Sequence, residues 1–337
     1  MSRLIVESCG PGTSIQDLGR FGWQRFGVGP AGAMDRVSLA MANYLAGNGA
    51  GAGAIEFALM GGRFRVAGGP ARIAVIGAEL RIEGATIPAL SSITVQPEWG
   101  IEVGATRTGL YSYLAVAGSL AVVPELGSLS LHMRAGIGGI AGRPLAAGDH
   151  LALNATMVGG ADLATTHAVA RDDGPIRVLL GPQDDYFSAT GLATFASSAY
   201  TVTAQADRMG IRLSGPKIEH GPNGYNIVSD GIVTGSIQVP GTGEPIILLA
   251  DRQTTGGYPK IATVISADLG RLAQMRPGTI LTFQAVSRGQ AIAALRAQTD
   301  ALEAFRWHLK PAGAAGLDSE RLLSLSLIDG WISGVSD

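Results

Sequence analysis

Two short apolar runs flank a polar loop in the stretch IILLADRQTTGGYPKIATVI, which occupies residues 246–265. The runs are Ile246–Leu249 and Ile261–Ile265, and both consist mainly of the aliphatic residues that strands favour. Pro259 closes the loop before the second run. We therefore predict two neighbouring strands joined by a hairpin loop over residues 251–259.

The same pattern of short apolar runs between turn residues recurs along the chain. Glycine accounts for 49 of the 337 residues, about twice its usual share of roughly 7 %. The glycines are dispersed between short Val/Ile/Leu runs, which indicates many tight turns and is typical of all-β barrels and sandwiches. The other predicted strands are Leu4–Val6, Arg63–Val66, Ile73–Ile76, Ile93–Val95, Tyr111–Val116, Arg177–Leu180, Ile227–Val228 and Ile280–Phe283.

Two segments have helical periodicity instead. The first runs from about Asp35 to Ala46, where Asp35 can cap the start and Gly47 can end the helix. The second runs from about Gly289 to His308, and Ser287 with Gln290 forms a capping box. Its predicted apolar face consists of Ile292, Leu295, Leu302 and Phe305.

Composition narrows the class of protein. Hydrophobic residues make up 46 % and charged residues 15 % of the chain, with a net charge of −2, so a folded core is expected. No Lys/Arg run is present, so neither nucleic acid nor a membrane surface is expected as a partner. The single cysteine, Cys9, excludes an intrachain disulfide and a cysteine-built zinc site. Without a signal peptide or a long apolar span, the expected location is the cytoplasm.

The chain is expected to divide into two subdomains and a tail. Residues 156–174 are rich in Ala, Gly and Asp, and a predicted strand begins directly afterwards. We place an N-terminal subdomain at 1–170, a second subdomain with the terminal helix at 171–308, and a tail at 309–337.

Several motif-like patterns favour structural over functional interpretations. Residues 27–32 match GxGxxG, but no buried strand precedes them as a dinucleotide site requires. The histidines lack metal-ligand spacing, so no metal site is predicted, and His220, in a glycine-containing loop, is the first histidine to examine. A small, partly buried thiol is favoured over a nucleophile for Cys9. No catalytic residue is assigned.

The polar loop of the opening stretch is the strongest candidate for binding. Its glycine pair, Gly256 and Gly257, permits positive φ and close approach of a ligand to backbone N–H groups. A planar polar ligand such as a ureido or lactam group suits this mixture of donors, acceptors and one aromatic ring. A hairpin loop whose hydroxyls cap local backbone groups is the alternative. The loop's candidate binding residues are Gln253, Thr254, Thr255, Gly256, Gly257, Tyr258 and the adjoining Lys260.

Three further segments combine glycine with polar or charged residues. Arg208 and Arg212 would share one face of a strand and could bind an anionic group, with a surface salt bridge as the alternative. Gln238 lies in the segment Gly235–Pro240 and joins the binding candidates. In the segment Gly12–Arg20, an Asp17–Arg20 pair would hold a turn. Secondary or structural candidates are Gln16, Asp17, Arg20, Asp35 and Asn43.

These segments, in their order along the chain, resemble the family that includes the C subunit of bacterial 5-oxoprolinase, also called allophanate hydrolase subunit 2 or the biotin-dependent carboxyltransferase-like family. The resemblance covers roughly residues 3–300. It rests on Gln16–Arg20, Gly29–Asp35, Ala42–Asn48, Ser112–Gly118, Gly136–Gly139 with Gly142-Arg143, Arg208–Gly210, and Val239-Pro240 up to Pro259. Thr234 and Gly241 depart from residues common in relatives, which leaves the substrate at the neighbouring loop open.

The resemblance implies a mainly β fold with two cyclophilin-like β-barrel subdomains and a few helices. It also implies action beside a B subunit, and in some systems an A subunit, on a small-molecule substrate. One implied activity is ATP-dependent opening of 5-oxoproline to glutamate, with ATP and Mg at the level of the complex. A second is carboxyl transfer to urea or a related amide, with biotin carried by another protein. A third is a non-catalytic role as a regulatory partner of the B subunit.

Overall fold

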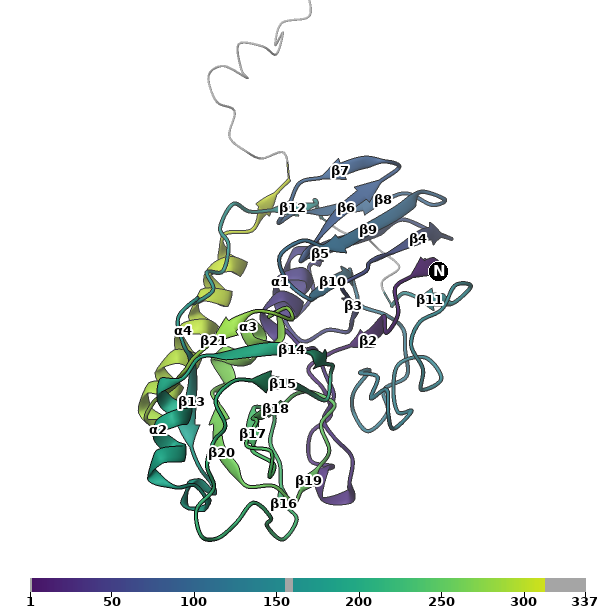
Figure 1. The fold of residues 1–337 in the computed structure, drawn as a ribbon. Coiled ribbons are helices and arrows are strands. Elements are labelled where there is room, and N and C mark those ends of the chain that lie inside the picture. Colours follow the sequence, from purple (N-terminus) through teal and green to yellow (C-terminus); the bar gives the residue numbers. More distant parts are fainter. Residues whose placement is uncertain (1, 155–159, 313–337) are drawn as a thin grey trace, which may run out of the picture.

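The computed structural model of the chain describes residues 2–154 and 160–312. Apart from two short strands at 163–164 and 310–311, its strands fall into two groups along the sequence, the first within residues 3–152 and the second within residues 176–285 (Figure 1). The mainly β fold with few helices predicted from sequence is confirmed. The boundary near residue 170 remains a prediction.

The first group of strands forms two antiparallel sheets. One has the order β11-β1-β4-β9-β6-β7 and the other β2-β3-β10-β5-β8. A cluster of buried aliphatic and aromatic side chains, including Phe57 and Phe64, packs within this half. The strands are β1 Arg3–Cys9, β2 Ser14–Gln16, β3 Ala54–Ala58, β4 Gly62–Ala67, β5 Ala71–Ile76, β6 Ala78–Ile82, β7 Ala85–Ile87, β8 Ser92–Val95, β9 Gly100–Thr106, β10 Tyr111–Val116 and β11 His150–Ala152.

The second group forms a near-closed, barrel-like sheet of eight strands in the order β21-β14-β15-β18-β17-β20-β13-β22. Neighbouring strands are antiparallel except β13 and β22, which are parallel. Two small sheets, β12-β23 and β16-β19, complete the strand pairings. The strands are β12 Leu163–Ala164, β13 Ile176–Leu180, β14 Tyr200–Ala206, β15 Gly210–Ser214, β16 Asp230–Gly231, β17 Ser236–Gln238, β18 Ile246–Leu248, β19 Thr255–Gly256, β20 Lys260–Val264, β21 Ile280–Leu281, β22 Phe283–Ala285 and β23 Lys310–Pro311.

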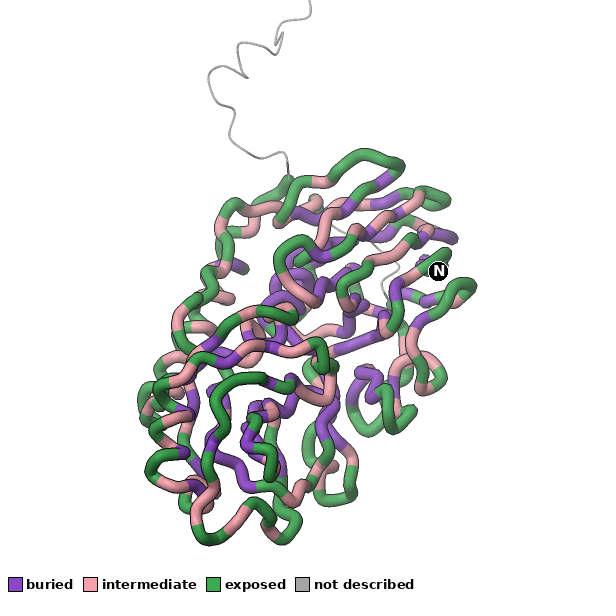
Figure 2. The backbone as a smooth tube through the Cα atoms, in the orientation of Figure 1, coloured by how far each residue is buried: buried purple, intermediate pink, exposed green. Residues whose placement is uncertain are grey.

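In the described part of the chain, four α-helices accompany the sheets, and α1 is almost wholly buried (Figure 2). Asp35 caps α1 through Val37 and Ser38 N–H groups, and Gly47 ends it with φ 88°, so this predicted helix is confirmed. The capping box of α4 is also confirmed. The helices are α1 Arg36–Ala46, α2 Ala189–Ser197, α3 Leu269–Ala273 and α4 Arg288–Trp307, with 3-10 turns η1 Gln24–Phe26, η2 Asp184–Tyr186 and η3 Ser266–Asp268.

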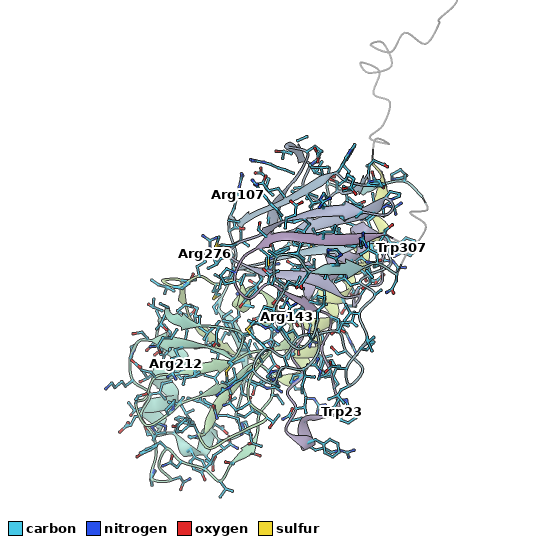
Figure 3. All side chains as sticks on the ribbon, turned by 90° about the vertical axis from the view of Figure 1, so that its right-hand side faces the viewer. Trp23, Arg107, Arg143, Arg212, Arg276 and Trp307 are labelled. Atoms are coloured by element: carbon cyan, nitrogen blue, oxygen red, sulfur yellow. The ribbon has the colours of Figure 1, made fainter. Side chains whose placement is uncertain are left out.

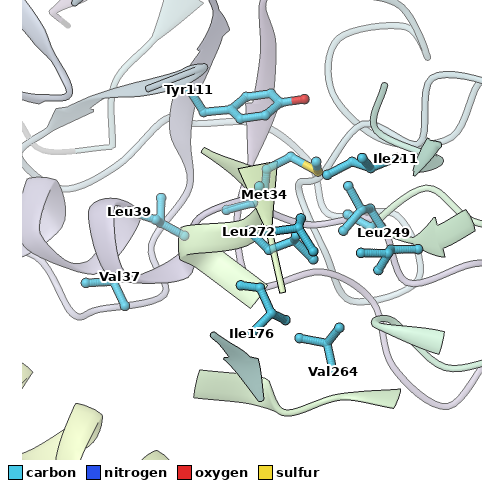
Figure 4. Close-up of a cluster of buried hydrophobic side chains, with 14 of the residues drawn as sticks. Met34, Val37, Leu39, Tyr111, Ile176, Ile211, Leu249, Val264 and Leu272 are labelled. Carbon is cyan, nitrogen blue, oxygen red and sulfur yellow. The ribbon is translucent and has the colours of Figure 1, made fainter. Parts of the chain in front are cut away.

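Helix α1 joins the two halves through a shared core. Leu39 from α1 belongs to the same buried cluster as Ile176, Val264 and Leu272 from the second half (Figure 4). The long helix α4 also packs on α1, and Tyr44 donates a hydrogen bond to Glu303 at 3.1 Å. The two groups of strands are therefore held together by buried apolar surface as well as by the connecting chain.

Three predictions at the level of single elements are wrong. The runs at 246–249 and 261–265 do form strands, but they are not a hairpin, because β17 lies between β18 and β20 and pairs with both. Residues 227–228 form no strand, and Val228 is exposed to solvent. Ile292 and Leu295 are exposed on α4, whereas Phe305 is buried.

The start of the predicted tail belongs to the folded part of the chain, because β23 pairs with β12. Residues 313–337 of that tail lie outside the described residues. Within residues 2–154 and 160–312, no helix combines the length and apolarity needed to cross a membrane.

Candidate functional site

Six of the predicted binding residues line one open cavity of about 580 Å³. Four come from the loop between β18 and β20, one from β15 and one from the end of β17. The end of β14, the turn to β15 with Asp207 and Met209, and Ile246 and Leu248 of β18 form most of the remaining wall. The six residues are Arg212, Gln238, Gln253, Gly256, Gly257 and Tyr258.

Arg212 and Tyr258 are two of the exposed polar or aromatic residues of this cavity, together with Gln205, Asp207 and Gln253. Arg212 is exposed on the barrel-like sheet (Figure 3), and alternation along β15 directs its side chain away from the buried neighbours Ile211 and Leu213. Tyr258 is 41 % exposed, so its ring is available as a stacking surface. The cavity therefore offers one exposed cation, one exposed carboxylate, that of Asp207, and one aromatic face.

Gly256 is closely packed but does not have a backbone conformation that favours glycine. The glycine pair permits positive φ, but neither residue adopts it, and Thr255–Gly256 forms β19 against β16. A Cβ atom at position 256 would lie 2.5 Å from Gln238 Nε2 and 2.7 Å from Ile232 Cδ1. A side chain at position 256 would therefore require the ends of the Gln238 and Ile232 side chains to shift.

Carbonyl oxygens fix the loop in place. The Thr254 carbonyl accepts from the N–H of Ile232 at 3.0 Å and from Gln24 Nε2 at 3.2 Å. The Gly257 carbonyl accepts from the N–H of Ile227 at 2.9 Å, and Gln238 Nε2 donates to the Tyr258 carbonyl at 3.3 Å. Thr254 and Thr255 belong to this loop but do not line the cavity.

Lys260 does not line the cavity but forms hydrogen bonds that hold the strand paired with the loop. Its side chain is 2 % exposed, and Nζ donates to Asp230 Oδ2 at 2.7 Å and to the Gly231 carbonyl at 3.1 Å. The hydrogen bond from Lys260 holds the pKa of the Asp230 carboxyl below its usual value. Because Asp230 and Gly231 form β16, this lysine anchors the strand that pairs with the loop.

Arg208 is held in a buried ionic cluster beneath a neighbouring cavity of about 360 Å³. It donates to Asp251 from Nε and Nη2, both at 2.9 Å, from Nη1 to Glu56, and from Nη2 to the Gly32 carbonyl at 2.8 Å. The expectation that it shares a strand face with Arg212 is wrong, because β15 begins only at Gly210. Its side chain is 11 % exposed, and most of its donors are already occupied.

Opposing effects act on the charges of this cluster. Burial raises the pKa of Glu56 above its usual value, although Arg208 opposes the shift. Burial alone would disfavour the Arg208 cation, but the fields of Glu56 and Asp251 raise the pKa of its guanidinium. Glu56 Oε2 also accepts from Tyr113 Oη at 2.7 Å and from the Met34 N–H at 2.9 Å. Arg208 thus connects the segment before α1, β3 and the base of the loop.

The remaining sequence candidates have structural contacts. Asp17 and Arg20 form no ion pair with each other, because Asp17 accepts from Ser128, Ser130 and two backbone N–H groups. Gln16 donates to Ser14 and the Leu131 carbonyl, while Asn43 donates to the Ala52 carbonyl. Asp35 caps α1, His220 contacts the Val239 carbonyl, and Cys9 Sγ donates to the Leu145 carbonyl, with burial raising the pKa of the thiol.

Sequence reasoning missed Glu56 and Gln24. Glu56 is one polar residue inside an apolar strand, which was a usable signal of a buried partner. Gln24 lies in η1, on the loop after β2 that extends alongside the second half of the molecule (Figure 1). Nothing in its local sequence indicates that it contacts Thr254, which lies 230 positions away.

The 580 Å³ cavity is suited to a small planar ligand with one anionic group. Gln253 supplies an amide, Tyr258 a ring and Arg212 a guanidinium that can bind a carboxylate in a bidentate manner. Its volume falls within the range of roughly 300–1,000 Å³ of small-molecule sites. In the described ranges, His, Cys, Asp and Glu side chains form no group of three or more that could hold a metal ion.

Comparisons with a family model and with known proteins agree on the family. Residues 26–285 match the family described as "Carboxyltransferase domain, subdomain A and B". The chain is 39 % identical over 280 residues to the C subunit of 5-oxoprolinase from Haemophilus influenzae, covering 82 % of this chain and 89 % of the relative. It is 33 % identical over 309 residues to the corresponding C subunit from Escherichia coli, covering 91 % of this chain and 98 % of the relative.

A solved structure extends the comparison to a larger enzyme. The crystal structure of Kluyveromyces lactis urea carboxylase matches with a TM-score of 0.83 and 27 % identity. The match covers 95 % of this chain and 30 % of the larger one.

Proposed function

Because this chain belongs to the carboxyltransferase-domain family of subdomains A and B, we propose that it acts as the C-type subunit of an ATP-dependent 5-oxoprolinase. The observation that carries the proposal is its similarity over most of the chain to two proteins named as the C subunit of 5-oxoprolinase. Its role would be to bind and orient the lactam within a complex that includes a B subunit and, for ring opening, an A subunit.

The chemistry of 5-oxoproline supports a place for it in the 580 Å³ cavity. The molecule has a planar lactam and one carboxylate. Arg212 would bind the carboxylate, the Gln253 amide would contact the lactam, and the Tyr258 ring would cover its face. Gln238 would act by fixing the loop through the Tyr258 carbonyl. We propose a cytoplasmic location, where ATP and the partner subunits would be available.

The cavity suits the lactam better than it suits a nucleotide triphosphate, because Arg212 is the cation among the described residues that lines it. ATP with Mg, bound at the level of the complex, would supply the activation of the lactam oxygen. A donor-rich loop would stabilise the charge that develops on that oxygen. The hydrolytic activity is therefore proposed for the complex and not for this chain by itself.

The test is ATP consumption by this chain mixed with its B and A subunits. We expect ADP release that depends on added 5-oxoproline, and we expect Arg212→Met to weaken that dependence by raising the KM for 5-oxoproline. Arg107→Met serves as the control, because Arg107 is 78 % exposed and lies in the first half of the molecule, away from Arg212 (Figure 3). ATP consumption at the same rate with and without 5-oxoproline would contradict the proposal.

Carboxyl transfer to urea or a related amide is the second candidate, favoured by the structural match to urea carboxylase. In that case the cavity would take the ureido ring of a biotin carried by another protein. Transfer of labelled carboxyl from carboxybiotin to urea, with no response to 5-oxoproline, would favour this candidate over the first. A purely regulatory role would leave both assays unaffected by Arg212→Met.

A further inference from the structure

Two buried arginines line a second cavity, on the other side of the base of the loop. Arg20 is 2 % exposed and Arg252 is 4 % exposed. Both line a cavity of about 390 Å³ between the loop after β2, the segment after β18 and helix α4. Arg20 is one of the secondary candidates from the sequence, whereas Arg252, which lies in the loop, is not among the candidates.

Both guanidinium groups have unused donors. Within the described residues, Nε and Nη1 of each arginine are buried and have no hydrogen-bond partner. Arg20 uses Nη2 to donate to the Ser130 carbonyl. Arg252 uses Nη2 to donate to Gln24 Oε1 at 3.2 Å and to the Ile232 carbonyl at 3.0 Å.

Carboxylates of the described residues form no ion pair with either arginine. Those that act on Arg20 from a distance include Asp17 and Asp251, whose oxygens are occupied by the 128–130 segment and by Arg208. Burial lowers the pKa of Arg20, and it lowers the pKa of Arg252 to about 10. A buried cation is costly unless an anion accompanies it. Because neither arginine has a carboxylate partner among the described residues, binding of an anion in this cavity would be favourable.

A third arginine, Arg36, also lines the cavity and donates to the Leu18 carbonyl at 3.1 Å. The rest of the lining is mainly apolar, which indicates what else the ligand would carry. Arginine binds carboxylate and phosphate groups through paired N–H donors. We propose that this cavity binds a small molecule bearing a carboxylate or phosphate group, held by Arg20 and Arg252, with an apolar body packed against the remaining walls. The apolar lining residues include Met34, Val37, Val233, Leu249 and Leu269.

This cavity and the candidate substrate cavity are separate, but the same loop segment contributes residues to both. Arg252 lines one and the next residue, Gln253, lines the other. Gln24 accepts from Arg252 and donates to the Thr254 carbonyl, so it links the arginine to the loop. An anion at Arg252 would therefore lie one residue from the proposed substrate site without occupying it.

The experiment measures the Tm of the full chain while sodium phosphate or sodium propionate replaces sodium chloride at constant ionic strength. The proteins are wild type, Arg20→Met, Arg252→Met and the control Arg63→Met, whose side chain is 66 % exposed. A bound anion raises the Tm of the folded chain. We expect one or both anions to raise the Tm of wild type and Arg63→Met, and this rise to be lost in both cavity variants.

A second readout separates ligand binding from a structural role. In chloride alone, Arg252→Met should keep a Tm close to or above that of wild type, because it removes an unpaired buried charge. Should that variant fail to fold, Arg252→Gln, which keeps a donor for the Ile232 carbonyl, takes its place. A phosphate-only response assigns a phosphoryl group, and a propionate-only response assigns a carboxylate. No response to either anion, or an equal response in all four proteins, would overturn the proposal.

Discussion

Arg208 is enclosed by two carboxylates, whereas Arg212 reaches solvent from β15. Replacing Arg208 by Met would leave Glu56 and Asp251 buried without their cation, so we expect a loss of about 3–5 kcal/mol in the free energy of unfolding. Arg212→Met should change stability by no more than about 0.5 kcal/mol, because it alters only the surface. Urea unfolding of both variants checks this, and equal stabilities would contradict the assigned surroundings.

Gly256 and Gly257 are a second matched pair of positions, because adding one methyl group to each should have different effects. A Cβ at 256 would overlap Gln238 and Ile232, so Gly256→Ala should cost about 1–3 kcal/mol and displace the loop. At 257 the nearest atom, the Ile227 carbonyl oxygen, is 3.6 Å away, and the alanine should be tolerated. Unfolding curves and the KM for 5-oxoproline in the complex measure the two effects. A destabilised Gly257→Ala beside an unchanged Gly256→Ala would refute the packing argument.

The residues of the site could be found from sequence only where the signal is local. Gln253 and Tyr258 were found because they share one loop with the glycine pair. Arg208 was found but given the wrong partners, because its contact with Glu56 joins positions 152 apart. A local pattern does not specify which distant carboxylate reaches a buried cation, and so the ionic cluster could not be predicted.

At the scale of elements, the α4 helix begins with a cap that can be tested alone. Ser287 accepts from the Gln290 N–H, and the Gln290 side chain accepts from the Ser287 N–H. Ser287→Ala removes one half of this box and should cost about 0.5–2 kcal/mol. Thr299→Ala is the control, because Thr299 lies inside the same helix and is exposed. Thermal unfolding should show a lower Tm for the first variant and a smaller change for the second.

Helix ends and strand positions could be predicted because their causes lie within a few residues. Asp35, Gly47 and Ser287 act on backbone groups close to them in sequence. Strand pairing has no such local cause. β18 and β20 follow each other across one loop, yet β17, from earlier in the chain, lies between them in the sheet and pairs with both. The expected hairpin failed for this reason.

At the scale of the whole molecule, the shared core around α1 should make the two halves unfold together. Leu39 is fully buried in the cluster that also contains Ile176, Val264 and Leu272 (Figure 4). Leu39→Ala would open a cavity between the halves and should cost about 2–5 kcal/mol. The loss should appear in both halves because α1 packs on β5 and β10 of the first half as well.

Hydrogen exchange at increasing urea measures this coupling, with amides of β4 reporting the first half and amides of β18 the second. In wild type and in Leu39→Ala we expect both sets to exchange at one urea concentration, lower in the variant. Ile82→Ala is the matched control, because Ile82 is buried in the other cluster, within the first half. If the halves form one cooperative unit, this control must lower the β18 midpoint as much as the β4 midpoint. Retained protection of β18 after β4 has exchanged would instead show that the barrel-like sheet is stable alone and that α1 only docks against it.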